Sequence, residues 1–134
     1  MTEGTHRNIN PDTLPPPSGY AHATVTAVGT AVYLGGQAGH RPDGSIAEDL
    51  VEQFDQACAN VLEALQAAGG EPEHLVHLTI YATDVVEYRG RLRELGEAWR
   101  RRFGKHYPAM ALIGATELFD AEARVELVGV AVVP

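Results

Sequence analysis

Two apolar segments at the C-terminal end of the chain constrain its fold most strongly. Residues 107–114 and 124–133 are rich in β-branched and other apolar side chains and are joined by an acidic loop, which predicts two strands. From Leu127 onward the apolar residues no longer alternate with polar ones, so we expect both faces of the last strand to be buried. A strand buried on both faces lies in the middle of a sheet, and the rest of the chain must cover that sheet.

One carboxylate, Glu126, lies within the last apolar segment. Burying a charge costs free energy unless the charge is paired or has a functional role. Glu126 either forms a salt bridge with Arg124 or with a neighbouring subunit, or it serves as a functional group in a cleft. The unbroken apolar run beside it favours the cleft.

The length and composition predict a single domain. A chain of 134 residues with 45% apolar and 21% charged residues buries a core without metal or disulfide support. Residues 1–16 are rich in Pro, Thr and Asn, and we expect them to form a flexible N-terminal arm ahead of a domain at 17–134. The single Cys58 favours a reducing compartment and a place in the core.

The charge and hydropathy patterns exclude several partners. Ten basic residues against eighteen acidic ones give a net charge of −8, which opposes binding to nucleic acid. No segment is long and apolar enough to span a bilayer, and the polar N-terminus is unlike a signal peptide, so we expect a cytoplasmic protein without membrane contact. The arginines at 100–102 are interpreted as the solvated face of a helix.

The N-terminal half predicts a β-hairpin followed by a helix. Residues 20–27 alternate in polarity, residues 28–30 form a turn, and residues 31–34 return as a second strand. Ser45 and Glu48 have the spacing of a capping box for the first helix. That helix carries one apolar stripe, formed by Val51, Phe54, Cys58, Val61, Leu62 and Leu65.

A strand and a second helix follow. Residues 75–83 alternate, with Val76, Leu78, Ile80 and Ala82 on the face opposite to His77, Thr79, Tyr81 and Thr83. Asp84 and Glu87 cap a helix that ends at Gly104 and buries Tyr88, Leu92, Leu95, Trp99 and Phe103. His74 and His77 have a spacing that metal ligands use, but they project to opposite faces of a strand and lack a third ligand, so we expect no metal and no cofactor.

The element order is therefore β-β-α-β-α-β-β, which predicts an α+β fold. Strand–helix–strand units favour parallel pairing and the terminal strands favour antiparallel pairing, so the sheet is mixed with two helices on one face. No segment remains to cover the other face. A second copy of the chain is the simplest cover, and we expect a homo-oligomer.

Four short segments resemble the Rid (YjgF/RidA) family over nearly the whole chain. They are SGYAHA at 18–23, VYLGGQAG at 32–39, YPA at 107–109 and VEL at 125–127. The resemblance implies a chorismate-mutase-like subunit of a homotrimer with ligand clefts between subunits.

The resemblance also implies which residues form the site. The family's imine and enamine deaminases have an arginine, which grips the substrate carboxylate, where this chain has Met110. A family hydroxyl residue is replaced by Gly35, and a helix asparagine falls near Arg93. Tyr20, Gly36 and Glu126 are retained: the tyrosine lines the cleft, and the glutamate holds the attacking water.

These features lead to two functional hypotheses. In the first, the protein converts a small imine or enamine other than 2-aminoacrylate, with Glu126 activating water and His22, on the same strand face as Tyr20, moving a proton. Met110 then lines a pocket for an apolar or uncharged ligand. In the second, the chain is a non-catalytic trimer that binds a small metabolite or a partner protein in the same clefts. An arginine from elsewhere that reaches the spot opposite Glu126 would favour the ordinary deaminase instead.

Overall fold

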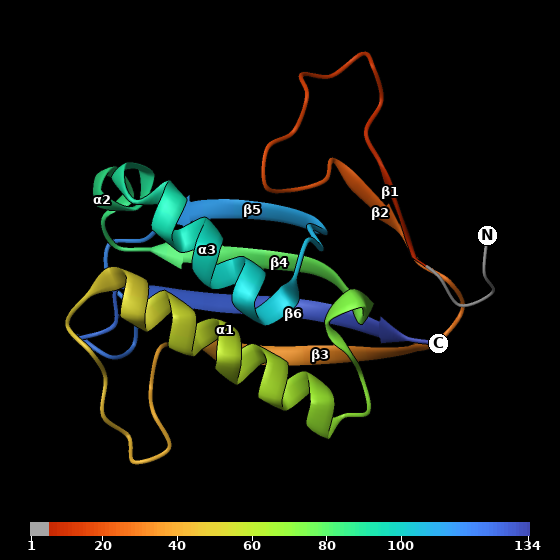
Figure 1. Cartoon of the computed structure of the whole chain (residues 1–134). Helices are drawn as coiled ribbons and strands as arrows, with labels where there is room; N and C mark the ends of the chain where they lie inside the picture. The colour runs from red at the N-terminus through yellow and green to blue at the C-terminus, as the bar shows by residue number, and fades with distance from the viewer. Residues whose placement is uncertain (1–5) are drawn as a thin grey trace.

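A four-stranded mixed sheet forms the centre of the computed structural model, which describes residues 6–134 (Figure 1). The sheet has the order β3-β6-β4-β5. Its strands are β3 (Thr30–Gln37), β4 (Leu75–Ala82), β5 (Ala109–Gly114) and β6 (Val125–Val133). β4 and β5 are parallel, and β6 runs antiparallel to both of its neighbours. The predicted mixed sheet, with the last strand at its centre, is therefore confirmed.

The long helices α1 (Leu50–Ala67) and α3 (Leu92–Phe103) lie on one face of this sheet (Figure 1). The second predicted helix is split in two, because the chain leaves helical geometry at Arg91 with φ −119°. Its first part is α2 (Val85–Gly90), which Asp84 caps by accepting a hydrogen bond from the backbone N–H of Glu87, 3.0 Å, as predicted. Leu92 was predicted to be buried, but it is 57% exposed.

Helix α1 contributes most of the helical core. Its buried residues repeat at helical spacing: Leu50, Gln53, Phe54, Ala57, Cys58, Val61 and Leu65. The predicted capping box at Ser45 and Glu48 is wrong. Asp49 caps the helix and accepts from the backbone N–H of Glu52, while Ser45 donates to Asp43 in the preceding turn. A short 3₁₀ helix, η1 (Pro72–His74), leads from α1 into β4.

The N-terminal strands pair differently from the prediction. β2 (Ala23–Val25) pairs with β1 (Arg7–Ile9) in a small antiparallel sheet beside one end of β5 (Figure 1). The predicted hairpin between residues 20–27 and 31–34 is wrong, because β3 pairs with the longer apolar strand β6 instead. β1 falls inside the predicted flexible arm at 1–16, of which residues 1–5 lie outside the described part.

One face of the sheet carries no helix from residues 6–134. Along β6 the burial alternates, so the row on the helix side is buried and the row of Glu126, Val128, Val130 and Val132 is half exposed. Tyr33 on β3 is 81% exposed. The expectation that both faces of β6 are buried is therefore wrong for a single chain. Two helices are enough to cover one face only, and the second face remains apolar and accessible.

Candidate functional site

Glu126 lies on the uncovered face of the sheet, where the pairing of β3 with β6 is interrupted. The regular register ends at Leu34 opposite Gly129 and resumes, shifted, at Gln37 opposite Leu127. Gly36 lies in this irregular stretch, and a Cβ atom built on it would stand 2.5 Å from Oε2 of Glu126. The missing side chain at Gly36 therefore provides the space that the carboxylate occupies.

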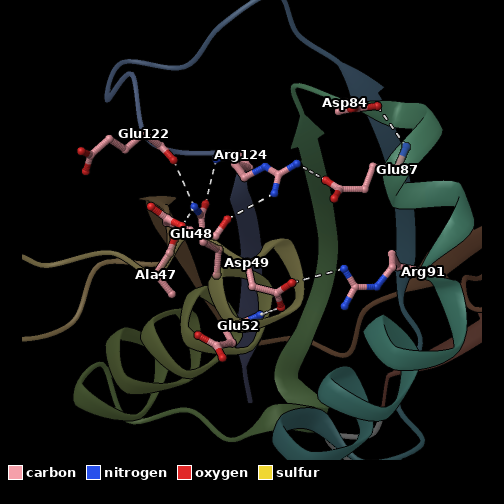
Figure 2. Close-up of polar contacts among 10 residues, drawn as sticks. Ala47, Glu48, Asp49, Glu52, Asp84, Glu87, Arg91, Glu122 and Arg124 are labelled. Carbon is pink, nitrogen blue, oxygen red and sulfur yellow. Dashed lines mark hydrogen bonds and ion pairs between the residues drawn. The ribbon is translucent and has the colours of Figure 1, made fainter.

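The Glu126 carboxylate has no ion-pair partner among residues 6–134. Arg124, the partner considered from the sequence, forms an ion pair with Glu87 and donates to the backbone carbonyl of Glu48 (Figure 2). Across the strands, Glu126 lies opposite Tyr81 of β4. The salt bridge to Arg124 within one chain is thus ruled out, and the carboxylate remains available for a ligand.

A polar network fixes the chain segment that leads into β6. Gln53, 1% exposed, donates from Nε2 to the carbonyls of Ala47, 2.7 Å, and Glu122, 3.0 Å. Its Oε1 accepts from the backbone N–H of Arg124, 2.8 Å. Figure 2 shows this region together with the ion pair between Asp49 and Arg91. The backbone at Arg124, two residues before Glu126, is thus held by the Gln53 side chain of α1.

A cavity of about 490 Å³ lies between α3, β5 and the segment before β2. Among the described residues, its wall is apolar or aromatic apart from Ser18 and one charged side chain. The lining residues are Ser18, Gly19, Tyr20, Phe54, Ile80, Tyr88, Leu92, Leu95, Gly96, Trp99, Arg100, Tyr107, Met110, Ala111 and Leu112. Its size and lining suit a small organic ligand.

Met110 and Glu126, which were expected to meet in one cleft, lie on opposite faces of the sheet within a single chain. Met110 pairs with Leu78, whose side chain is buried under the helices. Glu126 pairs with Tyr81, which belongs to the uncovered face. Successive residues of a strand point to opposite sides, so Met110 faces the cavity and Glu126 faces away from it.

Gly35 and Tyr20 are both accessible, but only Tyr20 lines the cavity. A Cβ atom at Gly35 would meet nothing within 4 Å, so this glycine exposes backbone on the same bulge as Gly36. The ring of Tyr20 lines the cavity and lies edge-on to His22, with the ring centroids 5.4 Å apart.

His22 and Arg93 do not line the cavity. The Nε2 atom of His22 lies 2.7 Å from the carbonyl oxygen of Pro15, so the ring helps to hold the loop before β2. The side chain of Arg93 is 92% exposed and lies beside Glu97, 3.7 Å away. The structure thus gives neither residue a contact with the candidate ligand space in a single chain.

Several residues of the cavity wall were not predicted from the sequence to be site residues. Trp99 was interpreted as a core anchor only; it is 4% exposed and donates from Nε1 to the carbonyl of His106, 2.9 Å, yet it also lines the cavity. Arg100 was assigned to a solvated face. Helical spacing was the available signal, because Leu92, Gly96 and Arg100 are four residues apart and share one side of α3.

The remaining reactive side chains lie outside the site. Burial raises the pKa of the Cys58 thiol well above its ordinary value, which fits a core residue and not a nucleophile. Among residues 6–134, no group of three or more His, Cys, Asp or Glu side chains is placed to hold a metal. None of the helices in that range is long and apolar enough to cross a membrane. The cytoplasmic location stays a prediction.

Comparisons with known proteins place the chain in a known family. The family model described as Endoribonuclease L-PSP matches residues 12–133. A RutC family protein from Aquifex aeolicus (strain VF5) is 32% identical over 126 residues, which cover 92% of this chain and 98% of that protein. The chain therefore belongs to the Endoribonuclease L-PSP family, which is the Rid (YjgF/RidA) family that the sequence resembles.

Solved structures agree with this assignment. YyfB from Yersinia pestis, a Rid-family protein of unknown function, superposes with a TM-score of 0.85 at 28% identity, covering 96% of this chain and 99% of that one. RidA from the Antarctic bacterium Psychrobacter sp. PAMC 21119 superposes with a TM-score of 0.69 at 26% identity, covering 95% and 99%. The predicted family and fold class are confirmed.

Proposed function

We propose that this protein converts a small imine or enamine by adding water to a carbon–nitrogen double bond in a cleft between two copies of the chain. The position of Glu126 supports this proposal most. Its carboxylate has no ion-pair partner in residues 6–134 and lies against the bare backbone of Gly36, on an uncovered sheet face. A carboxylate in such a place is suited to hold and activate water.

The proposed reaction is hydrolysis of an imine. Glu126 accepts a proton from water as the water oxygen bonds to the imine carbon, and the proton passes to the nitrogen. The resulting carbinolamine transfers its hydroxyl proton to the nitrogen, and as the carbon–nitrogen bond breaks it releases ammonia and a carbonyl compound. One water is consumed for each ammonia released, and Glu126 returns to its starting charge.

The proposed site needs more than one copy of the chain, and we propose a homotrimer. The cavity with Tyr20 and Met110 opens on one side of the sheet and Glu126 lies on the other, so a second copy is required to bring them together. The half-exposed apolar row on β6 supports such an assembly. Tyr20 shapes the cavity wall, whereas His22 has no role in the proposed mechanism because its ring nitrogen already contacts Pro15.

We propose a substrate different from 2-iminopropionate, the imine derived from 2-aminoacrylate. Methionine at position 110 offers a soft apolar surface in place of a guanidinium. Together with Leu112, it lines a cavity with room for a larger apolar group.

The test compares imines generated in the assay by an amino-acid oxidase, with release of the keto acid followed over time. We expect no acceleration on the imine of alanine and clear acceleration on a branched or aromatic imine. Glu126→Gln should lower the rate on the latter by about 100-fold. Glu73→Gln, which changes an exposed carboxylate on η1, is the matched control. Strong wild-type activity on the alanine imine would contradict the proposed substrate, and full activity of Glu126→Gln would contradict the mechanism.

A second candidate is a non-catalytic trimer that binds a small metabolite in the same cleft. The apolar lining around Met110 favours it, since a binding site needs no water-activating group. Its signature is ligand binding that persists in Glu126→Ala, with no turnover on any imine. Ribonuclease activity, which the family description names, is not favoured, because a net charge of −8 repels a phosphate backbone.

A further inference from the structure

Arg100 differs from the other arginines of α3. The side chain of Arg102 donates to Asp55 at 3.0 Å, and that of Arg101 lies 3.6 Å from the same carboxylate. Arg93 lies beside Glu97. Arg100 has no ion-pair partner among residues 6–134, and it is the one charged residue on the wall of the cavity described above.

Gly96 shows where the guanidinium of Arg100 lies. A Cβ atom built on Gly96 would stand 3.2 Å from Nη1 and 3.8 Å from Nη2 of Arg100. The arginine side chain therefore folds back by one helical turn and lies over the bare backbone of Gly96. Because Gly96 also lines the cavity, the guanidinium is placed at the cavity wall and not only in solvent.

The rest of the cavity wall is mostly aromatic and apolar. Five aromatic rings line the cavity, those of Tyr20, Phe54, Tyr88, Trp99 and Tyr107. Trp99 and Tyr107 are stacked, with an interplanar angle of 19°. A cavity with aromatic walls and one guanidinium matches a ligand that has an apolar body and one anionic end.

We propose that Arg100 binds the carboxylate of a small ligand whose aromatic or branched apolar body fills the cavity. The carboxylate accepts two hydrogen bonds from the guanidinium, and the body packs against the aromatic wall and Met110. This inference rests on the proposed function, because it assigns the substrate class of the same cavity. The carboxylate grip then comes from α3, since position 110 on β5 has no charge to offer.

The test measures binding of phenylacetate and of its uncharged analogue phenylacetamide to the full-length protein by titration calorimetry. We expect the wild type to prefer phenylacetate by about tenfold or more, as for a ligand bound by a charge-assisted hydrogen-bond pair. Arg100→Gln should abolish this preference and leave the affinity for phenylacetamide unchanged. Arg89→Gln, which removes an exposed arginine on α2 outside the cavity, should behave like the wild type.

Two further measurements separate this inference from the proposed function. Glu126→Gln should lose turnover and keep the preference for phenylacetate, because Glu126 does not line the cavity of its own chain. Gly96→Val should weaken the preference, because the new side chain displaces the guanidinium. An equal preference in the wild type and in Arg100→Gln would overturn the role of Arg100, as would a wild type that binds neither compound. Either result would leave the outcome of the imine assay unaffected.

Discussion

The absence of a side chain at Gly36 leaves the space in which the Glu126 carboxylate lies. The nearest obstacle to an added Cβ atom is the far end of the Glu126 side chain, which can rotate away. At Gly39, in contrast, an added Cβ atom would meet the backbone of Gln53 at 2.5 Å from the carbonyl oxygen. Gly36 lies near the end of β3 and Gly39 lies just after it, yet one shapes a site and the other a packing contact.

The pair gives a direct prediction. Gly36→Ala should change the free energy of unfolding by less than about 1 kcal/mol, because only a flexible side chain has to move. It should still lower turnover, because the carboxylate is displaced. Gly39→Ala should cost about 1–3 kcal/mol or more, because the backbone of α1 must shift. Chemical denaturation and the imine assay measure the two effects. A Gly36→Ala protein with wild-type turnover would show that the position of Glu126 is not critical.

The sequence predicted those site residues whose chemical type is unusual for their sequence context. Glu126 is a charge inside an apolar strand, and Met110 stands where the family resemblance leads one to expect an arginine. Arg100 was missed because three consecutive arginines indicate a solvated helix face. The fold-back over Gly96, a local contact between residues four apart in α3, places its guanidinium at a cavity that only the tertiary fold creates. Gln53 was missed because a single polar residue in an apolar helix stripe does not reveal its partners.

At the scale of the elements, the apolar pattern predicted correctly which strand is central. It did not predict which strands pair when the partners are distant in the sequence. The continuous apolar run of β6 correctly indicated the central strand. The hairpin between residues 20–27 and 31–34 was wrong, because local alternation does not specify which strand a segment pairs with. The break between α2 and α3 was missed as well. Arg91 lies at this break and forms ion pairs with Asp49 and Glu94, and the apolar periodicity does not reveal the tertiary contact with Asp49.

Gln53 connects α1 with two loops, so its replacement should affect several elements together. Gln53→Met keeps the shape of the side chain but leaves two carbonyls and one backbone N–H without their partners. We expect a loss of about 3 kcal/mol in the free energy of unfolding, from buried polar groups left unsatisfied. Denaturant unfolding followed by circular dichroism measures it. Gln56→Met, which removes only one contact to Asn60, is the control and should cost much less.

At the scale of the whole molecule, the uncovered sheet face is the main apolar surface to be explained. Val130 lies near its centre, opposite Tyr33 of β3 and His77 of β4. Both neighbours are exposed in a single chain. An apolar face of this kind on a central sheet favours self-association.

Val130→Lys should therefore separate the copies without unfolding them. The half-exposed position lets a lysine reach water in a single chain, whereas a charge buried between copies is unfavourable. We expect sedimentation to show a trimer for the wild type and a monomer for the variant, with similar circular dichroism. Val86→Lys, at a 75% exposed position on α2, should remain a trimer. A monomeric wild type would contradict the assembly and, with it, the shared cleft.

The placement of Met110 and Glu126 on opposite faces of one sheet predicts complementation between two inactive variants. If each active site combines the cavity of one copy with the glutamate of another, a mixed oligomer of two variants contains some intact sites. Co-assembly of an Arg100→Gln chain with a Glu126→Gln chain should restore part of the turnover that each lacks alone, since some interfaces then unite two intact halves.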